Sequence, residues 1–496
     1  MTMTMAAAAA ASLRKVLVIV GTTGAGKTKL SIDLAKAVGG EIINSDAMQM
    51  YRGLDIATAK VTEQEKDGVP HHLLDIVDPS GRCDVLEFKR RALHTIDEIL
   101  ARGNVPIIVG GTMYYTQSIL WKSQLLDDVP VRSDAPQIPE DATPEDLYAR
   151  LQEVDPVMAS RWHVRQTRRV RRSLEVFYQT GVPHSEHIAR QERANASMEK
   201  YFDACALWVH CNKTTLAERL EKRVDKMMET GLVDEIKRLR AEIHANPPQY
   251  RPSTTTESRG GDDDIDNDDQ DGDDNAGPQV DYQVGILQAI GYKEFAPYLD
   301  ALEARKRQRD QADASATEDK EQQEEEEEEA ALRKLFDSCV EQLNIATRQY
   351  ARRQLSWIRN RFATRNIPVY QVDSSDVSQW DEQVATPAIA IAQSFLRGEP
   401  VSAYKSVQES EPERYTPQSQ EDKYKETICE ICGNRKFVGK TQWAQHLKSK
   451  GHRYHVRRVE IERERERNGD VSASSKRPRH THEANNNEDT NGVKET

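Results

Sequence analysis

A short glycine-rich segment near the N-terminus has the residue types of a phosphate-binding site. Its pattern, GxxxxGK[ST], is that of a P-loop, in which backbone N–H groups and the start of the following helix surround phosphate oxygens. Lys27 is expected to reach the terminal phosphate, and Thr28 is expected to hold Mg²⁺. The pattern leaves open which phosphorylated ligand binds. The residues of the segment are Gly21, Thr22, Thr23, Gly24, Ala25, Gly26, Lys27 and Thr28.

A second group near the C-terminus has the residue types and spacing of a zinc site. Two cysteines separated by two residues precede two histidines, and this arrangement predicts tetrahedral ligation of a structural Zn²⁺ with no open position for catalysis. A redox-active cysteine pair is the alternative, but it leaves the histidines unexplained. The ligands are Cys429, Cys432, His446 and His452. Lysines and arginines around them suit contacts with RNA phosphates.

An acidic side chain follows the second expected strand, at residues 41–45. P-loop hydrolases usually carry a second Mg²⁺-binding acid at the end of another apolar strand, but the run Val105–Val109 ends in two glycines and Thr112 instead. The acid here is Asp46. Because the carboxyl ends of parallel strands face the ligand crevice, it should point toward the phosphates or toward a second substrate. Asp46 is interpreted either as a helix cap or outer partner of Mg²⁺, or as a general base.

The elements that must position these residues alternate between strands and helices. The β-branched run at residues 16–20 is typical of a buried strand, and further strands are expected at 41–45, 105–109 and 207–211. Helical patterns cover 27–38 and 85–101 between them. This order predicts an α/β fold, with a P-loop NTPase-like parallel sheet, a helical insertion domain and a C-terminal zinc finger. Further helical patterns cover residues 144–180, 216–239 and 332–362.

Shifts in composition predict the domain boundaries. We expect a disordered N-terminus or transit segment at 1–14, a P-loop catalytic core at 15–122, an arginine-rich helical insertion at 123–200, the remainder of the core with C-terminal helices at 201–365, a strand and linker at 366–422, the finger at 423–460 and a disordered tail at 461–496.

The charge of the chain is concentrated in two runs. The 496 residues carry a formal net charge of −13, which by itself argues against nucleic-acid binding. The runs Asp262–Asp274 and Glu318–Glu329 together carry −17, so the rest of the chain carries about +4. We expect these runs to lie in disordered insertions at 253–280 and 303–330, because such charged segments cannot be buried. The mildly basic remainder keeps RNA open as a partner.

Several motifs, in this order along the chain, resemble the tRNA dimethylallyltransferase (isopentenyltransferase) family. The first runs from Asn44 to Lys60, reads NSDAMQMYRGLDIATAK and contains Asp46. The others are Pro70–Pro79, Pro106–Thr112, Arg168–Val176, Gly285–Phe295 and Thr347–Trp357. The resemblance spans about Val16–Phe362 apart from the acidic runs, and the C-terminal finger is similar to that of the eukaryotic branch.

The resemblance implies a reaction. Members of this family transfer a dimethylallyl group from dimethylallyl diphosphate to N6 of the adenine 3′-adjacent to the anticodon (position 37) of tRNAs that read UNN codons, and they release diphosphate. The P-loop would then hold a diphosphate rather than ATP. Asp46 would accept the N6 proton, Thr112 would orient the reacting groups, and Lys27 with Mg²⁺ would neutralise charge on the leaving diphosphate. Arg223, or less directly Arg219, would bind the same diphosphate.

The resemblance also implies a surface for the tRNA anticodon stem-loop. The expected contacts are Asp46, Ala47, Met48, Gln49, Arg168, Arg169, Arg172, Arg348 and Arg352. For the arginines, a solvated helix face is the alternative, and Arg359 is expected on the same face as Arg348 and Arg352. Before Arg168 the chain reads His163-Val-Arg165-Gln166 where relatives commonly have His-Pro-Asn-Asp, which leaves the geometry of that loop open. We expect the adenine to be flipped into a channel between the core and the arginine-rich helices.

Two other functions remain as alternatives. A P-loop kinase explains the glycine-rich loop but neither the finger nor the Asn44–Lys60 motif. A non-catalytic RNA-binding protein explains the basic residues but not the joint presence of Lys27, Thr28, Asp46 and Thr112. We expect no membrane association, because no apolar run is long enough to span a bilayer. We also expect a monomer. We expect it in the cytoplasm and mitochondrion, with Lys476–Arg479 as a candidate nuclear signal.

Overall fold

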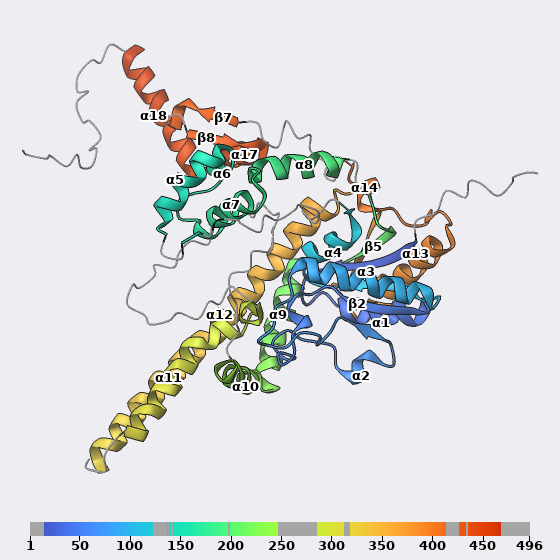
Figure 1. The fold of residues 1–496 in the computed structure, drawn as a ribbon, viewed down its shortest axis with the longest axis horizontal. Coiled ribbons are helices and arrows are strands. Elements are labelled where there is room, and N and C mark those ends of the chain that lie inside the picture. The colour runs from blue at the N-terminus through green and yellow to red at the C-terminus, as the bar shows by residue number, and fades with distance from the viewer. Residues whose placement is uncertain are drawn as a thin grey trace, which may run out of the picture. The chain divides into compact units, whose positions relative to one another are not determined.

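The computed structural model describes residues 14–122, 136, 138–139, 142–196, 199–246, 285–311, 318–412, 426–432 and 435–467. The predictions for residues 1–13, for the first acidic insertion at 253–280 and for the tail beyond 467 lie outside this part of the chain. The chain divides into two units, Met1–Thr416 and Pro417–Thr496, and each is described by itself (Figure 1). Within the described residues, no helix is long and apolar enough to cross a membrane.

The first unit is built on a parallel six-stranded sheet, which confirms the predicted fold class. The strand order is β3-β2-β4-β1-β5-β6, and each neighbouring pair is parallel. Asn44 pairs with Val109, and Gly21 pairs with Val209, so the segments that follow β2, β4 and β1 leave the sheet at one edge. The strands are β1 (Lys15–Gly21), β2 (Gly40–Asn44), β3 (His71–His72), β4 (Val105–Val109), β5 (Asp203–His210) and β6 (Val369–Asp373).

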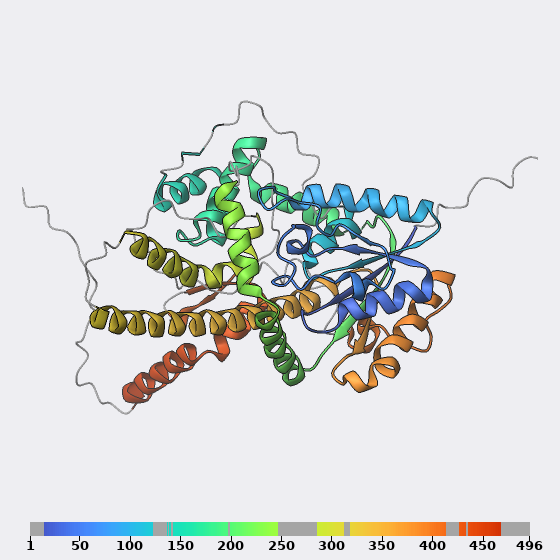
Figure 2. The ribbon, with the colours of Figure 1, turned by 90° about the horizontal axis from the view of Figure 1, so that it is seen from below.

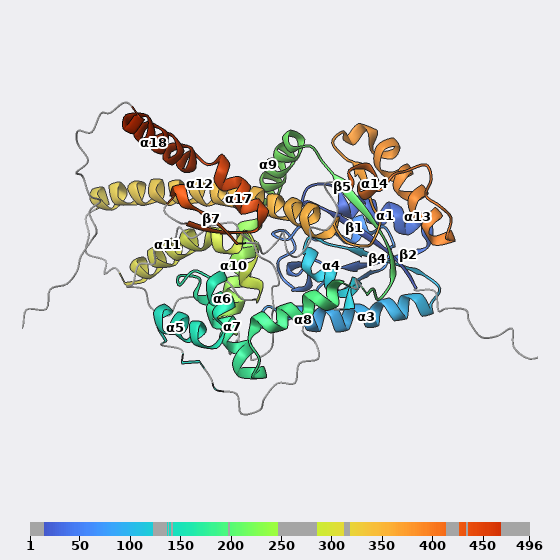
Figure 3. The same cartoon turned by 90° about the horizontal axis from the view of Figure 1, so that it is seen from above.

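Helices cover both faces of the sheet, as the continuous apolar character of β1 requires. On one face, Leu17 and Ile19 pack with Leu30 of α1 (Lys27–Val38) and Ile391 of α13 (Thr386–Arg397). On the other face, Val18 packs in a core with side chains of α3 (Val85–Ala101) and α4 (Met113–Leu120). Figure 3 shows α1 and α13 on one side of the sheet and α3 and α4 on the other.

The helical stretch predicted at 216–239 is two helices. α9 (Lys213–Glu229) ends at Thr230, and α10 (Leu232–Ala245) begins after Gly231. Gly231 has a φ of 97°, a left-handed conformation that a glycine adopts without strain and that ends the first helix. The apolar pattern of residues 216–239 continues through Gly231 without a change of period, so the pattern alone predicts one helix instead of two.

The predicted helical insertion forms four helices with a core of their own. They are α5 (Pro144–Val154), α6 (Pro156–Arg161), α7 (Thr167–Thr180) and α8 (His184–Ala196). Thr143 and Asp155 cap the first two helices with their side chains, and each cap is followed by proline at the first helical position. Leu151 and Leu174 lie in the core that these helices share.

The second acidic segment is helical, so the prediction of disorder at 303–330 is wrong for the described residues of that range. α11 (Tyr292–Gln311) and α12 (Glu318–Trp357) pack against each other as an antiparallel pair (Figures 1 and 2). Arg305 pairs with Glu328 at 3.0 Å, and Arg309 pairs with Glu325. Glutamate is a good helix former, and arginines of the facing helix offset part of the repulsion within the run.

The segment 366–422, predicted as a strand and linker, is largely part of the core. It contains β6, a π-helical turn at Asp381–Ala385, α13 and α14 (Val407–Ser410). Trp380, Val384 and Ile391 are buried against α1 and the sheet, and Trp380 Nε1 donates to Asp33 Oδ2 at 2.9 Å. The apolar spacing of α13 is helical and was assigned no element from the sequence. Only 413–422 of this segment lies outside the described residues.

The second unit contains the predicted finger. An antiparallel pair, β7 (Glu426–Cys429) and β8 (Arg435–Val438), precedes α17 (Gly439–Lys448) and α18 (Lys450–Arg467). The last helix continues to Arg467, so the predicted start of a disordered tail at 461 is wrong by seven residues.

Candidate active site and metal centre

The P-loop has the strand–loop–helix context that its pattern requires. Gly24 and Gly26 have φ values of 79° and 99°, which favour glycine. A Cβ at Gly26 would lie 2.9 Å from the Trp380 ring, so this ring covers the loop closely. The Lys27 ammonium donates to the Thr22 carbonyl at 3.0 Å, and Thr28 is exposed at the first turn of α1. The loop therefore presents backbone N–H groups, an ammonium group and a hydroxyl at the sheet edge.

Asp46 leaves the end of β2 in a fixed orientation. Asn44 Oδ1 accepts from the Asp46 N–H at 2.9 Å, and Asn44 Nδ2 donates to the Asp46 and Leu73 carbonyls at 3.0 Å each. Asp46 Oδ1 accepts from the Met48 N–H at 3.1 Å, which is a capping bond to the short turn that follows. Its other oxygen, Oδ2, lies against Gly111. One oxygen thus has the capping role, and the other faces the turn after β4.

Lys27, Asp46 and Arg223 meet at this edge and shift one another's pKa. Burial lowers the pKa of Lys27 to about 8; the Asp46 carboxylate opposes this shift, and the charge of Arg223 adds to it. Burial raises the pKa of Asp46, while Lys27, the Met48 N–H and Arg223 lower it. Burial lowers the pKa of Arg223, against the attraction of Asp46. Two cations face one carboxylate, so the pocket suits an anionic ligand.

Of the two candidate arginines on α9, only Arg223 is directed toward Asp46. Arg219 Nη2 donates to the Ser374 carbonyl at 2.6 Å and Nη1 contacts Cys211 Sγ at 3.5 Å, which ties α9 to the end of β6. The two residues are four apart on the helix, and the sequence alone does not say which one faces the sheet edge.

Two residues of α12 enter the site although sequence reasoning assigned them no role. Gln354 contacts both the P-loop at Thr23 and the carbonyl of Gly111. Tyr350 hydrogen-bonds with the Thr112 side chain, and burial strongly raises the pKa of its hydroxyl. The Thr112 hydroxyl oxygen also accepts from the Ala47 N–H at 3.1 Å. The sequence does contain a signal for them: Tyr350 and Gln354 are four residues apart within Thr347–Trp357, so they lie on one face of a helix. Only the arginines of this motif were assigned a role from the sequence.

The loop after Asp46 is held by a buried glutamate that sequence reasoning also missed. The Glu235 carboxylate on α10 accepts three backbone N–H groups, from Asp55, Ile56 and Ala57, at 2.7, 2.8 and 2.9 Å. Gln49, expected to contact tRNA, donates its amide to the Thr58 carbonyl at 3.0 Å within the same loop. Glu235 therefore fixes the backbone on which Gln49 rests.

The arginines of α12 are not all on one face. Arg352 is exposed and Arg348 is half-buried, on the side of the helix opposite to Tyr350. Arg359 instead lies over the ring of the buried Trp208, 6.0 Å from its centroid, so the expected row of three arginines is not formed. The helix changes to a π-helical turn at Ile358–Phe362, which shifts the angular position of the side chains beyond Trp357.

The arginines of α7 differ in their surroundings. Arg169 lies over the Trp162 ring at 4.9 Å. The Arg172 side chain is only 16% exposed and forms an ion pair with Glu175 at 3.3 Å. Its charge is therefore partly neutralised within the insertion. The side chain of Arg168 lies outside the described part of the structure. The divergent loop before α7 is closed by Gln166, whose Oε1 accepts from the His163 N–H at 3.1 Å.

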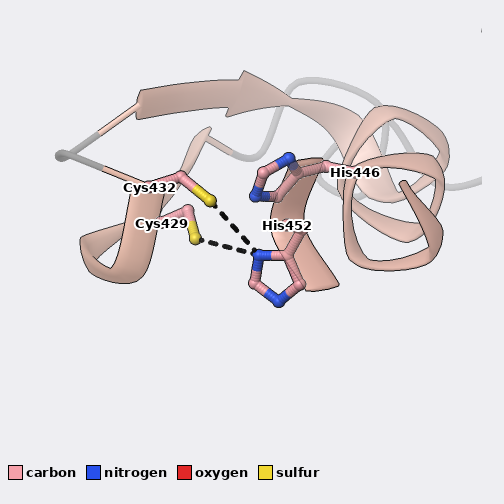
Figure 4. Close-up of side chains that lie close together, drawn as sticks. All are labelled: Cys429, Cys432, His446 and His452. Atoms are coloured by element: carbon pink, nitrogen blue, oxygen red, sulfur yellow. Dashed lines mark hydrogen bonds between the residues drawn. The ribbon is translucent and has the colours of Figure 1, made fainter. Parts of the chain in front are cut away.

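The four predicted zinc ligands come together in the second unit (Figure 4). Their donor atoms lie within 4.8 Å of one another, and the two sulfurs are 3.5 and 3.4 Å from His452 Nδ1. Tetrahedral Zn²⁺ with bonds of about 2.3 Å to sulfur and about 2.0 Å to nitrogen separates these atoms by about 3.5 Å. The donor set therefore fits a structural Zn²⁺, as predicted, and accounts for the histidines that a redox pair leaves unexplained. The four ligands are Cys429, Cys432, His446 and His452.

Comparisons with known proteins agree with this geometry. A sequence model described as IPP transferase matches residues 49–361, and one described as a zinc-finger of C2H2 type matches 427–452. The chain is 35% identical to the tRNA dimethylallyltransferase of Homo sapiens over 452 residues, covering 88% of this chain and 84% of the relative. For the Schizosaccharomyces pombe protein of the same name the identity is 31%, covering 90% and 96%.

A solved structure is also similar over most of the chain. It is a eukaryotic dimethylallyltransferase acting on tRNA, 30% identical to this chain, with a TM-score of 0.63. The match covers 92% of this chain and all of the other. The residues matched by the IPP transferase model begin at Gln49, after the P-loop and Asp46.

Proposed function

The chain belongs to the IPP transferase family and is an enzyme of the tRNA dimethylallyltransferase type, and from this premise we propose its specific reaction. It transfers a dimethylallyl group from dimethylallyl diphosphate to N6 of the adenine 3′-adjacent to the anticodon (position 37) of tRNAs that read UNN codons. The observation that carries the proposal is the meeting of Lys27, Arg223 and Asp46 at the end of the sheet. Two cations suit a diphosphate, and the single carboxylate suits a proton acceptor.

The diphosphate is held by the P-loop and its neighbours. Backbone N–H groups of the P-loop other than those of Thr23 and Ala25, which have partners within the protein, would contact its oxygens together with the ammonium of Lys27. Arg223 approaches from α9. Thr28, exposed beside the loop, is the residue that would hold Mg²⁺, which supplies further positive charge to the leaving group when bound. No acidic residue follows β4, where P-loop hydrolases usually carry their second Mg²⁺-binding acid. The proposed reaction does not need that acid, because the attacking group is an amine and no water has to be activated.

The transfer itself exchanges one bond for another. The adenine N6 forms a bond to C1 of the dimethylallyl group while the C1–O bond breaks, and its electron pair leaves with the diphosphate. Asp46 accepts the proton that N6 loses. Burial makes this carboxylate more basic than an exposed one, while Lys27 and Arg223 help to keep it ionised before substrate binds. Thr112, bonded to the Ala47 N–H, orients the reacting amine beside it.

The tRNA is bound by the loop after Asp46 and by basic helices. Ala47, Met48 and Gln49 lie next to the proton acceptor and contact the flipped adenine. Arginines contact the phosphates and fix the register of the stem-loop, as phosphate contacts generally do. The residues assigned this role are Arg168, Arg169, Arg172, Arg348 and Arg352. The exposed position of Arg352 and the partial exposure of Arg348 support it, whereas the ion pair of Arg172 makes its part indirect.

One assay tests the proposal against the alternatives. The full-length protein is incubated with Mg²⁺, dimethylallyl diphosphate and unmodified tRNA that reads UNN codons, and the digested tRNA is searched for N6-isopentenyladenosine by mass spectrometry. A tRNA with another base in place of the adenine is the control. Product on the first tRNA alone supports the proposal. Phosphoryl transfer from ATP without this product favours a kinase, and tRNA binding without either favours a non-catalytic protein.

We also propose that the protein acts as a monomer in the cytoplasm and mitochondrion, with the nucleus as a further site. Imaging of tagged full-length chains with and without residues 1–14, and with Lys476–Arg479 neutralised, tests the location. Loss of the mitochondrial signal on deletion supports a transit segment, and an unchanged distribution contradicts it.

A further inference from the structure

We propose that Gln354 is a positioning residue for the prenyl transfer, because its side chain fixes the P-loop to the turn after β4. Gln354 lies on α12 and is 4% exposed. Its Oε1 accepts from the Thr23 N–H at 2.7 Å, and its Nε2 donates to the Gly111 carbonyl at 3.0 Å. One carboxamide therefore joins the diphosphate loop to the residue before Thr112. These partners are more than two hundred residues away from it in the chain.

The turn at Gly111 is where the side chains of Asp46, Gln354 and Tyr350 converge. A Cβ placed on Gly111 would lie 2.6 Å from both Asp46 Oδ2 and Gln354 Nε2, and 2.9 Å from the Tyr350 hydroxyl. Each of these distances is too short for a real side chain, so the approach of α12 to Asp46 depends on the glycine. The proton acceptor and the carboxamide of Gln354 are therefore both direct neighbours of Gly111.

A second connection runs one helical turn away from Gln354. Tyr350 hydrogen-bonds with the Thr112 side chain, whose oxygen accepts from the Ala47 N–H. Tyr350 and Gln354 thus hold two parts of the site from a single face of α12. Tyr350 holds the loop of the proton acceptor through Thr112, and Gln354 holds the diphosphate loop through Thr23. Because α12 is a continuous helix here, it sets the spacing between the two parts. A misplacement of about 1 Å in such a site can cost about 10²-fold in rate.

This role predicts a specific kinetic signature. Loss of the carboxamide frees the P-loop from Gly111, so binding of the diphosphate weakens and kcat/KM for dimethylallyl diphosphate falls. Binding of tRNA is unaffected, because Arg348 and Arg352 lie on the opposite side of the helix. A residue that only stabilised the fold would lower the amount of active enzyme, and so the apparent kcat, while KM for both substrates and the diphosphate affinity of the folded molecules stayed unchanged.

The inference rests on the proposed function and is tested with two variants of the full-length protein. Gln354→Met removes the hydrogen bonds to Thr23 and Gly111, and also the one to Tyr350, at similar volume. Gln354→Asn keeps a carboxamide that is too short to reach both Thr23 and Gly111. Gln342→Met, exposed on the same helix, is the matched control. Steady-state kinetics give KM for each substrate. Titration calorimetry with magnesium and inorganic diphosphate measures the affinity of the P-loop for diphosphate.

For both Gln354 variants we expect weaker diphosphate binding and a fall of about 10²-fold in kcat/KM for dimethylallyl diphosphate, with KM for tRNA as in the wild type. Should Gln354→Met fail to fold, Gln354→Asn decides the matter. Wild-type diphosphate binding in a folded variant, or a fall in kcat with both KM values unchanged, would overturn the inference. Absence of product from the wild type and from Gln342→Met would instead overturn the proposed function.

Discussion

Lys27 and Asp46 each stabilise the charged form of the other at the edge of the sheet, although burial works against both. Burial lowers the pKa of Lys27 to about 8 and raises that of Asp46, and the attraction between the two opposes each shift. The pair is neutral as a unit, and Arg223 adds a further positive charge. An incoming diphosphate therefore meets net positive charge.

Asp46→Asn should lower turnover by about 10²–10⁴-fold, because the reaction loses its proton acceptor. The amide can still accept from the Met48 N–H, so the loop and the affinity for tRNA should be retained. Single-turnover rates and filter binding measure the two effects separately. Asp234→Asn, exposed on α10, is the control. Unchanged turnover in Asp46→Asn would remove Asp46 from the mechanism.

The pH dependence of kcat/KM for dimethylallyl diphosphate should be bell-shaped. Activity rises with pH as Asp46 loses its proton, above the usual range of a carboxyl, and falls as pH rises through about 8, where Lys27 loses its charge. Bound diphosphate stabilises the ammonium, so the alkaline limb of kcat alone should lie at higher pH. In Lys27→Arg the alkaline limb should be absent, since arginine stays protonated. An alkaline limb at the same pH in Lys27→Arg would assign it to another group.

Arg223→Ala and Arg219→Ala form a matched pair on one helix. Loss of Arg223 should raise KM for dimethylallyl diphosphate by about tenfold or more, the effect of losing a charge-assisted contact worth about 1.5–3 kcal/mol. Loss of Arg219 removes the hydrogen bond to the Ser374 carbonyl and should lower the melting temperature. KM for dimethylallyl diphosphate should be unchanged in this variant. Steady-state kinetics and thermal unfolding distinguish the two. The reverse assignment would follow if Arg219→Ala carried the KM defect.

Glu235→Leu should destabilise the loop after Asp46. Three backbone N–H groups lose their acceptor, and an unpaired donor costs about 1–3 kcal/mol when it is buried and less where water reaches it. The free energy of unfolding should therefore fall, and KM for tRNA should rise because Gln49 rests on this loop. Glu242→Gln, exposed on α10, is the control. A stability and a tRNA KM equal to those of the wild type would contradict the anchoring role.

Cys429→Ser should release the zinc and weaken tRNA binding more than it slows the chemical step. The site loses a thiolate ligand, and the fold of such a finger depends on its metal. Zinc content is measured by mass spectrometry, tRNA affinity by titration and chemistry by single turnover with saturating tRNA. Glu430→Gln, next to it and exposed, should change none of these. A large defect in chemistry with normal tRNA affinity would contradict the assigned role of the finger.

Local patterns predicted the sheet and the metal site, whereas long-range contacts could not be predicted. The P-loop, β4, α1 and α3 follow from periodicity and from glycine spacing, and the zinc ligands follow from their own spacing. Gln354, Tyr350 and Glu235 were missed because their partners are far away in the chain and no local pattern marks a polar side chain as buried.

The acidic run was mispredicted for a related reason. Its repulsion is partly offset by arginines of α11, which composition alone does not reveal. The arginines of the Thr347–Trp357 motif were predicted as one row, and the π-helical turn that follows moved Arg359 toward Trp208.

The single helix α12 carries the glutamate run in its first part and Arg348 and Arg352 in its last part. With a rise of 1.5 Å per residue, Glu329 and Arg348 are about 28 Å apart along it. Electrostatic screening at physiological salt acts over about 8 Å, so the glutamates scarcely reduce the attraction of the arginines for a polyanion. Binding should therefore keep the steep ionic-strength dependence of a basic protein, even though the chain as a whole migrates as an acidic one.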